Sequence, residues 1–132
     1  MRQSYSPFRL SQLLTRFTFF EPILMAILLV GCGYLGSRAG RRWLAAGEDV
    51  YTITRSAEKA QDFSQQGYRP IVADVTQPAT LQSLPAVQTV LYAVGYDRQS
   101  GGSIDEVYVS GLRNVLDRLP GSARMIYIST TG

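Results

Sequence analysis

The chain has 132 residues, of which 45% are hydrophobic and 17% are charged. This length suits one domain, and the apolar fraction is high enough to build a core, which excludes a globally disordered chain. The sequence contains no histidine and one cysteine, Cys32. These counts exclude a Ser-His-Asp triad, a histidine-ligated metal, an internal disulfide and a cysteine-based zinc site, so we predict no metal centre.

The basic residues do not follow a nucleic-acid-binding pattern. The net charge is +3, from 13 basic and 10 acidic residues, and Lys59 is the only lysine. The arginines are scattered along the chain, with no basic run that interleaves with aromatic residues. We therefore expect no nucleic acid partner.

Residues 1–24 differ in character from the rest, and we expect a poorly ordered extension ahead of a domain over 25–132. Met25 would be a natural start for that domain. The alternative is an extra helix over 11–20 that packs on the domain. The apolar run over 23–30 is much shorter than the roughly 20 residues of a transmembrane helix, so we expect no transmembrane segment and a cytoplasmic protein.

A second interpretation of the same run is a processing signal. Arg16 precedes the apolar residues, and the sequence Leu-Val-Gly-Cys that ends at Cys32 looks like a bacterial lipoprotein cleavage site. A secreted lipoprotein cleaved at Cys32 is therefore one alternative for the function of the chain.

Apolar segments of strand length alternate with helical patterns along the chain. A helical pattern after residue 33 places Leu35, Ala39, Trp43 and Leu44 on one face, with Gly47 as its end. Ser56 can cap a second helix that ends at Gly67, and a short turn fits 78–84. Ser103 and Glu106 form a capping-box pattern at the start of a helix over 103–119, whose apolar stripe is Ile104, Val107, Tyr108, Leu112, Val115, Leu116 and Leu119. The expected strands are 26–30, 50–54, 69–73, 89–93 and 124–129.

This alternation predicts an α/β fold, a doubly wound parallel sheet of the Rossmann type with strand order 3-2-1-4-5. The sequence stops just after the fifth strand. We therefore expect a domain that is truncated at its C-terminus, with an open sheet edge that allows self-association.

The residues Gly31-Cys32-Gly33-Tyr34-Leu35-Gly36 form a G-x-G-x-x-G motif between a buried strand and a helix. In this setting the first glycine permits a tight turn, the second lets the backbone approach a pyrophosphate, and the third lets the helix lie against the strand. Free amides at the start of the helix can hold phosphates, which adds Tyr34 and Leu35 to the cofactor-binding set. The motif predicts a dinucleotide site. Cys32 within it is best explained as a small apolar filler.

The end of the second strand indicates which dinucleotide is bound. An acidic residue about 20 positions past the loop would accept from the ribose hydroxyls of NAD. Arg55 and Ser56 stand there instead. An arginine offers several donors to a 2′-phosphate, so NADP is favoured and NAD is the alternative. Arg55 can also be a solvated loop charge, and Ser56 can also cap the following helix.

Together with the glycine loop, three further motifs carry a resemblance to a family: Asp74-Val75, Ala93-Val94-Gly95, and the run from Tyr127 to Gly132. From Met25 onward the chain resembles the extended short-chain dehydrogenase/reductase group, and within it the NAD-dependent epimerase/dehydratase-like proteins. The resemblance implies that Asp74 and Val75 lie beside the adenine and that Ala93, Val94 and Gly95 line the cofactor. It also implies that Thr130, with Ser129 and Thr131 as rivals, contacts the substrate.

The chain departs from this family at the catalytic pair. The family uses a tyrosine with a lysine four residues later, and Tyr-x-x-x-Lys is absent throughout this sequence. We therefore expect an NAD(P)-binding domain of an epimerase/dehydratase-type oxidoreductase that does not complete catalysis alone. The implied substrate is a small molecule, with nucleotide sugars as one class. The alternative from another class is a catalytically silent nucleotide-binding or interaction module.

Overall fold

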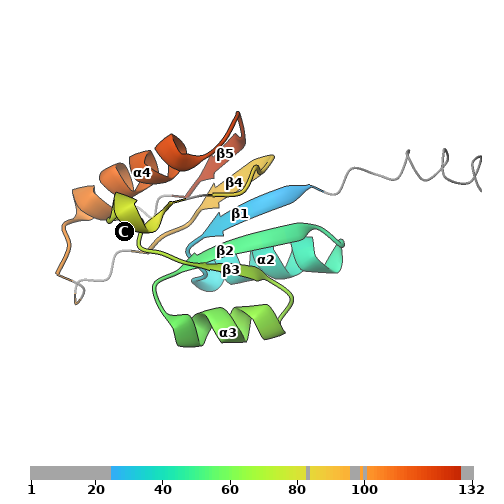
Figure 1. Cartoon of the computed structure of the whole chain (residues 1–132). Coiled ribbons are helices and arrows are strands. Elements are labelled where there is room, and N and C mark those ends of the chain that lie inside the picture. The colour runs from blue at the N-terminus through green and yellow to red at the C-terminus, as the bar shows by residue number, and fades with distance from the viewer. Residues whose placement is uncertain (1–24, 83, 96–98, 100, 129–132) are drawn as a thin grey trace, which may run out of the picture.

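The computed structural model describes residues 25–82, 84–95, 99 and 101–128, which form one parallel sheet with helices on both faces (Figure 1). The strand order β3-β2-β1-β4-β5 confirms the prediction. The expectations for residues 1–24 and for Ser129–Gly132 lie outside the described residues. The strands are β1 (Ala26–Val30), β2 (Asp49–Thr54), β3 (Arg69–Val72), β4 (Thr89–Tyr92) and β5 (Arg124–Tyr127). Between them lie α2 (Tyr34–Ala45), α3 (Ala57–Gln65), the 3-10 turn η1 (Pro78–Thr80), the π-helix η3 (Glu106–Ser110) and α4 (Gly111–Arg118).

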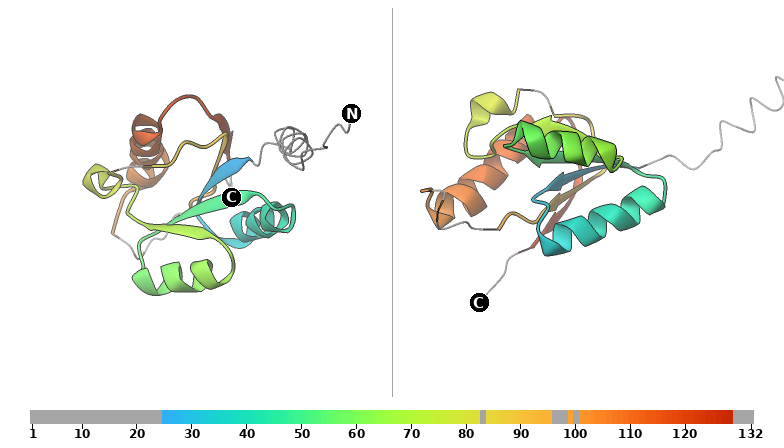
Figure 2. Two further views of the ribbon diagram at one scale, coloured as in Figure 1. Left: turned by 45° about the vertical axis from the view of Figure 1, so that its right-hand side comes forward. Right: turned by 90° about the horizontal axis from the view of Figure 1, so that it is seen from below.

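Two core clusters sandwich the sheet, because successive side chains of a strand point to opposite faces. Leu28 and Val30 of β1 pack in the cluster that includes Val115 of α4. Leu29, between them, packs in the cluster that includes Trp43 of α2. Helices α2 and α3 therefore cover one face and α4 the other, as the two views in Figure 2 show. The central strand β1 pairs with both β2 and β4 and is almost fully buried.

The predicted helix ends are present in the structure. Gly47 and Gly67 follow α2 and α3 with positive φ angles of 81° and 100°, a conformation that favours glycine. The Ser56 hydroxyl accepts a hydrogen bond of 3.2 Å from the amide of Lys59 and so caps α3. Because these caps are local, sequence alone located the two helices to within a residue or two.

The inner face of α2 differs from the prediction. Leu35 is 49% exposed, and the fully buried residues of the helix are Gly36 and Gly40. A Cβ atom on Gly36 would lie 2.1 Å from the carbonyl oxygen of Gly31, and one on Gly40 would lie 2.5 Å from the hydroxyl of Tyr68. The helix thus approaches the sheet along a row of glycines, which leaves Leu35 outside the core.

The helix after β4 also differs from the prediction. Its capping box is formed, since the Ser103 hydroxyl accepts from the Glu106 amide at 3.1 Å and a Glu106 carboxylate oxygen accepts from the Ser103 amide at 3.2 Å. The π-turn η3 then interrupts the regular 3.6-residue period. The single predicted stripe is split, with Val107 and Val115 buried but Ile104 and Leu116 about half exposed.

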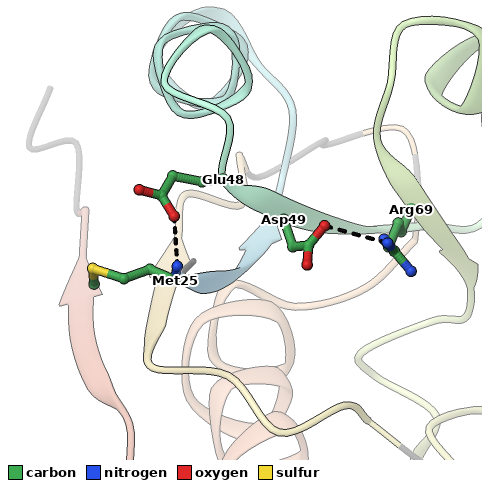
Figure 3. Close-up of polar contacts among 4 residues, drawn as sticks. All are labelled: Met25, Glu48, Asp49 and Arg69. Carbon is green, nitrogen blue, oxygen red and sulfur yellow. Dashed lines mark hydrogen bonds and ion pairs between the residues drawn. The ribbon is translucent and has the colours of Figure 1, made fainter. Parts of the chain in front are cut away.

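Polar contacts tie the amino ends of the strands together (Figure 3). The backbone amide of Met25 donates to a carboxylate oxygen of Glu48 at 2.5 Å. Arg69 of β3 forms an ion pair of 3.3 Å with Asp49 of β2. Both side chains of this pair are exposed, so it adds less than about 1 kcal/mol to the free energy of unfolding. The amino ends of the strands lie at the opposite end of the sheet from the carboxyl ends. Within the part of the chain described, no helix combines the length and apolar character needed to cross a membrane.

Candidate functional site

A pocket of about 200 Å³ lies at the carboxyl ends of the strands. Its walls come from the ends of β1, β2, β3 and β4 and from η3. Chain order reverses between β1 and β4, and ligands of open α/β sheets bind at such a switch point. The lining residues are Val30, Gly31, Ile53, Thr54, Arg55, Ala73, Asp74, Val75, Thr76, Val94, Gly95 and Val107.

Two glycines of the G-x-G-x-x-G loop are explained by contacts within the chain. Gly31 has a φ of +94°, and a Cβ there would lie 2.4 Å from the carbonyl oxygen of Ala93. Gly36 lies against the carbonyl of Gly31, as described above. These two glycines therefore serve the tight turn and the close approach of α2 to β1.

Gly33 has no such explanation. Its φ is −71°, which any residue can adopt, and beyond its chain neighbours no described atom lies within 4 Å of the position of a Cβ. Gly95, which lines the pocket, likewise has a φ outside the positive range, and among the described residues no atom beyond its chain neighbours lies within 4 Å of the position of a Cβ. Neither packing nor backbone conformation demands glycine at these two positions. The bare backbone there leaves room for a ligand to approach closely.

The start of α2 has the electrostatics of an anion site. The Ser37 amide makes the first helical hydrogen bond, to the Gly33 carbonyl at 2.9 Å, so the amides before it have no helical partner. The first turn contains no acidic residue. Unpaired amides and the positive end of the helix dipole favour a bound anion.

At the end of β2, the two adjacent residues that the sequence assigned to the cofactor have different positions in the structure. Arg55 is exposed and lines the pocket. Ser56 is not among the lining residues, and its hydroxyl caps α3. Arg55 is thus the residue of the pair that can reach a ligand in the pocket.

The end of β3 holds its acidic residue rigidly. One carboxylate oxygen of Asp74 accepts from the Thr76 amide at 2.9 Å and from the Thr76 hydroxyl at 2.7 Å. The Asp74 amide in turn donates to the Thr80 hydroxyl at 2.9 Å. Asp74, Val75 and Thr76 all line the pocket. A carboxylate held in this way offers an acceptor beside an apolar surface.

The pocket gathers part of the predicted site. Of the residues proposed from sequence, it is lined by Gly31, Arg55, Asp74, Val75, Val94 and Gly95. Gly33, Tyr34, Leu35 and Gly36 belong to the adjacent loop and the first turn of α2, Ala93 packs its carbonyl against Gly31, and Thr130 lies outside the described residues. Sequence reasoning missed Val30, Ile53, Thr54, Ala73, Thr76 and Val107. Val30 and Thr54 end strands, and Ile53 and Ala73 lie next to a strand end, so their positions in the predicted strands could have identified them. Val107 lies in the π-turn, and the sequence carried no signal for it.

Two titratable groups near the site keep their protons. Burial raises the pKa of the Cys32 thiol from 9.0 to about 11, so at neutral pH this residue is a small apolar side chain. Burial is also the main cause that raises the pKa of Tyr92 above its ordinary value of 10.0, with smaller contributions from Tyr127 and Tyr108. Neither group is prepared for proton transfer near neutral pH.

A protein-family comparison identifies the fold family. The model of the TrkA-N domain matches residues 27–100, from β1 to beyond the end of β4. The chain belongs to the TrkA-N domain family. This TrkA-N domain has a Rossmann NAD(P)-binding fold. No curated protein matches the chain.

Solved structures share the fold at low identity. The NAD(P)-binding domain of an exopolyphosphatase-related protein from Archaeoglobus fulgidus superposes with a TM-score of 0.59 at 24% identity, over 80% of this chain and 74% of that one. A short-chain dehydrogenase from Streptomyces avermitilis gives 0.65 at 18%, over 84% of this chain and 50% of that one. CAD from Helicobacter pylori, solved with NADP(H), gives 0.54 at 18%, over 89% of this chain and 29% of that one. This TrkA-N domain thus spans half or less of the last two proteins, and the likeness is one of fold.

Proposed function

We propose that this TrkA-N domain binds NADP(H), with NAD(H) as the weaker ligand, across the glycine loop and the pocket beside it. The observation that carries the proposal is Gly33, a glycine that neither its φ nor any neighbour requires. A backbone left bare next to the free amides of a helix start is what a diphosphate needs.

We propose a contact with a different part of the dinucleotide for each group of residues in the loop and the pocket. The amides from Gly31 to Gly36 would hold the diphosphate. Asp74 would accept from the exocyclic amine of adenine, and Val75 would pack on the ring. Ala93, Val94 and Gly95 would line the part of the cofactor that leads away from the adenosine. These roles rest on the positions of the residues at the strand ends and on the resemblance to short-chain dehydrogenases.

Arg55 supports NADP over NAD. It lines the pocket at the end of β2, where an acidic residue would favour the ribose hydroxyls of NAD, and its neighbours Thr54 and Ser56 carry no charge. A guanidinium can donate several hydrogen bonds to a 2′-phosphate. One structural neighbour, CAD from Helicobacter pylori, was solved with NADP(H), which agrees with this preference.

We further propose binding without turnover by this chain alone. A bound nicotinamide supplies hydride transfer, and the parent reaction of the epimerase/dehydratase type would act on a carbon bearing a hydroxyl or carbonyl, with nucleotide sugars as one substrate class. That chemistry needs a tyrosine helped by a lysine, and the sequence has no Tyr-x-x-x-Lys. The Tyr92 hydroxyl donates a hydrogen bond to a backbone carbonyl, so it is already engaged within the fold. Thr130 stays a proposed substrate contact. We also propose a cytoplasmic location, which suits a reduced dinucleotide ligand.

Titration with NADPH, followed by its fluorescence, tests the proposal. Wild-type protein should give saturable binding, and Gly33→Asp should abolish it because the added carboxylate repels the diphosphate. The matched control is Ala45→Asp, which adds the same charge to an exposed site at the other end of α2. If wild type and Gly33→Asp are indistinguishable, the proposal is wrong.

One observation favours a second function, that of a nucleotide-binding interaction module. β5 lies at the edge of the described sheet, and its residues Ile126 and Tyr127 are about 40% exposed. An edge strand with apolar side chains can pair with another copy. Size-exclusion chromatography with light scattering should then show dimers that Ile126→Lys converts to monomers. The lipoprotein alternative gains no support, because cleavage at Cys32 would remove β1, the central strand.

A further inference from the structure

A π-turn lies where the helix after β4 passes the pocket. η3 covers Glu106–Ser110 and runs directly into α4. The amide of Gly111 bonds to the carbonyl of Glu106, five residues back. In an α-helix the same amide would bond to the carbonyl of Val107, four residues back. The π-turn therefore directs this amide away from Val107, which is also the residue of the helix that lines the pocket.

Tyr92 supplies the hydrogen bond to Val107 from the sheet. Its hydroxyl donates to the Val107 carbonyl at 2.6 Å, and the whole residue is 0% exposed at the end of β4. The ring is held in turn by Tyr127 of β5, which stacks on it at 5.9 Å between centroids and 12° between planes. Because burial raises the pKa of Tyr92, the hydroxyl remains a donor across the physiological pH range. A buried side chain thus fixes the carbonyl of a pocket residue.

A second contact fixes the same helix to the segment after β3. The side-chain amide of Asn114 donates to the carbonyl of Val75 at 2.8 Å. Gly111 lies between these two hydrogen bonds, because a Cβ there would be 2.6 Å from the Tyr92 hydroxyl and 3.0 Å from a methyl carbon of Val75. The helix is therefore held close to both Val75 and Tyr92, without room for a larger residue at Gly111.

We propose that Tyr92 is a positioning residue for the dinucleotide pocket, and that through the Val107 carbonyl it sets the π-turn that brings the Val107 side chain into the apolar wall. That wall also contains Val30, Ile53 and Val75. An apolar wall suits a purine ring more than a phosphate or a ribose. Tyr92 therefore acts on the affinity for the adenosine half of the ligand. This inference rests on the proposed function.

Tyr92→Phe tests it, because this variant keeps the ring and its stacking and removes only the hydroxyl. Calorimetric titrations would use NADPH, adenosine 2′,5′-bisphosphate and nicotinamide mononucleotide. We expect the Kd values for the first two to rise about three- to tenfold, the size expected for one lost positioning hydrogen bond, and the Kd for the mononucleotide to stay unchanged. The matched control is Tyr68→Phe, which removes a buried tyrosine hydroxyl from the other face of the sheet. It should leave all three Kd values unchanged.

A double-mutant cycle with Val107→Ala shows whether Tyr92 acts through Val107. Val107→Ala alone should weaken binding of adenosine 2′,5′-bisphosphate, and adding it to Tyr92→Phe should weaken binding little further. Additive losses would overturn the inference. So would unchanged binding by Tyr92→Phe, or equal losses for the adenosine and nicotinamide fragments. If wild type binds none of the three ligands, the proposed function itself fails.

Amide hydrogen exchange tests the inference on the wild-type chain, so the result does not depend on whether a variant folds. Adenosine 2′,5′-bisphosphate should slow amide exchange over 106–112, because a base packed on Val107 opposes opening of the π-turn. Nicotinamide mononucleotide should not do so. If the bisphosphate binds and exchange over 106–112 is unchanged, Val107 does not contact the base and the inference is wrong.

Discussion

Gly31 and Ala93 lie so close that a Cβ on the glycine would sit 2.4 Å from the carbonyl oxygen of Ala93. This contact joins the loop after β1 to the residue after β4, at the point where the chain order of the sheet reverses. Two residues further on, a Cβ on Gly33 would have no described atom within 4 Å beyond its chain neighbours. The same motif thus contains one glycine required by the fold and one that the fold does not explain.

Alanine at these two positions should separate stability from binding. Gly31→Ala combines a positive φ with a backbone clash and should lower the free energy of unfolding by roughly 3 kcal/mol. Gly33→Ala changes an unstrained N-cap residue and should cost no more than about 1 kcal/mol. Urea unfolding would measure both. Gly33→Ala should nevertheless weaken NADPH binding, and equal losses of stability would contradict the distinction.

Arg55→Ala should change the preference between the two dinucleotides. Loss of the guanidinium should raise the Kd for NADPH about tenfold and leave that for NADH nearly unchanged, because only NADPH carries the 2′-phosphate. Fluorescence titration measures both. Arg69→Ala, which removes an exposed arginine at the opposite edge of the sheet, is the control for net charge. Equal weakening of NADPH and NADH by Arg55→Ala would show that the residue does not contact the 2′-phosphate.

The half-buried thiol of Cys32 predicts how the free energy of unfolding depends on alkaline pH. Its pKa is raised by burial from 9.0 to about 11. Between these values the unfolded chain loses the proton while the folded chain keeps it, so stability is complete below about pH 9 and falls as the pH rises toward 11. Urea unfolding at pH 8 and pH 10 would measure the fall, since those values bracket the ordinary pKa of the thiol.

Cys32→Ala is the control for this pH dependence. It should lose less stability between the two pH values than wild type. Tyr68 and Tyr92 contribute to the loss that remains, because burial also raises their pKa values. The thiol should react with a disulfide reagent much faster in urea than in the folded protein. A rapid reaction of the folded protein near neutral pH would contradict the burial argument.

Thr52 offers a stabilising substitution. The residue is 0% exposed in the middle of β2, and its hydroxyl oxygen has no hydrogen-bond partner within the described residues. Thr52→Val replaces this hydroxyl with a methyl group of similar size and should raise the free energy of unfolding by about 1 kcal/mol. Thermal unfolding would measure the gain. The control is Thr89→Val in β4. Thr89 is also buried, but its hydroxyl does not belong to the buried groups without a hydrogen-bond partner. A loss of stability in Thr52→Val would show that the hydroxyl has a partner.

Sequence alone predicted the features that depend on local chemistry. The order of the sheet follows from alternating strands and helices, and the ends of α2 and α3 follow from Gly47, Gly67 and Ser56. The turn at Gly31 also follows from the residue itself. At the helix ends and at the turn, the determining group is a residue at the position it controls, so a pattern of residue types is enough.

The parts that sequence missed depend on contacts between distant segments. Leu35 is exposed because α2 is drawn toward β1 along Gly36 and Gly40, a spacing that the helical period does not reveal. Val107 enters the pocket because Tyr92, 15 residues earlier, bonds to its carbonyl in a π-turn. An apolar stripe at regular α-helical spacing predicts neither the extra residue of that turn nor the exposure of Leu116.

The pocket takes its walls from both halves of the chain, from 30–76 and from 94–107. A folding intermediate that contains only β1, β2 and β3 has the glycine loop but lacks the wall of the pocket that comes from 94–107. Ligand affinity should therefore appear late in refolding, after β4 has inserted beside β1. During unfolding, a saturating dinucleotide should slow the separation of 30–76 from 94–107 more than it slows the fraying of α3. In this way cofactor occupancy would report whether the central strand has acquired both of its neighbours.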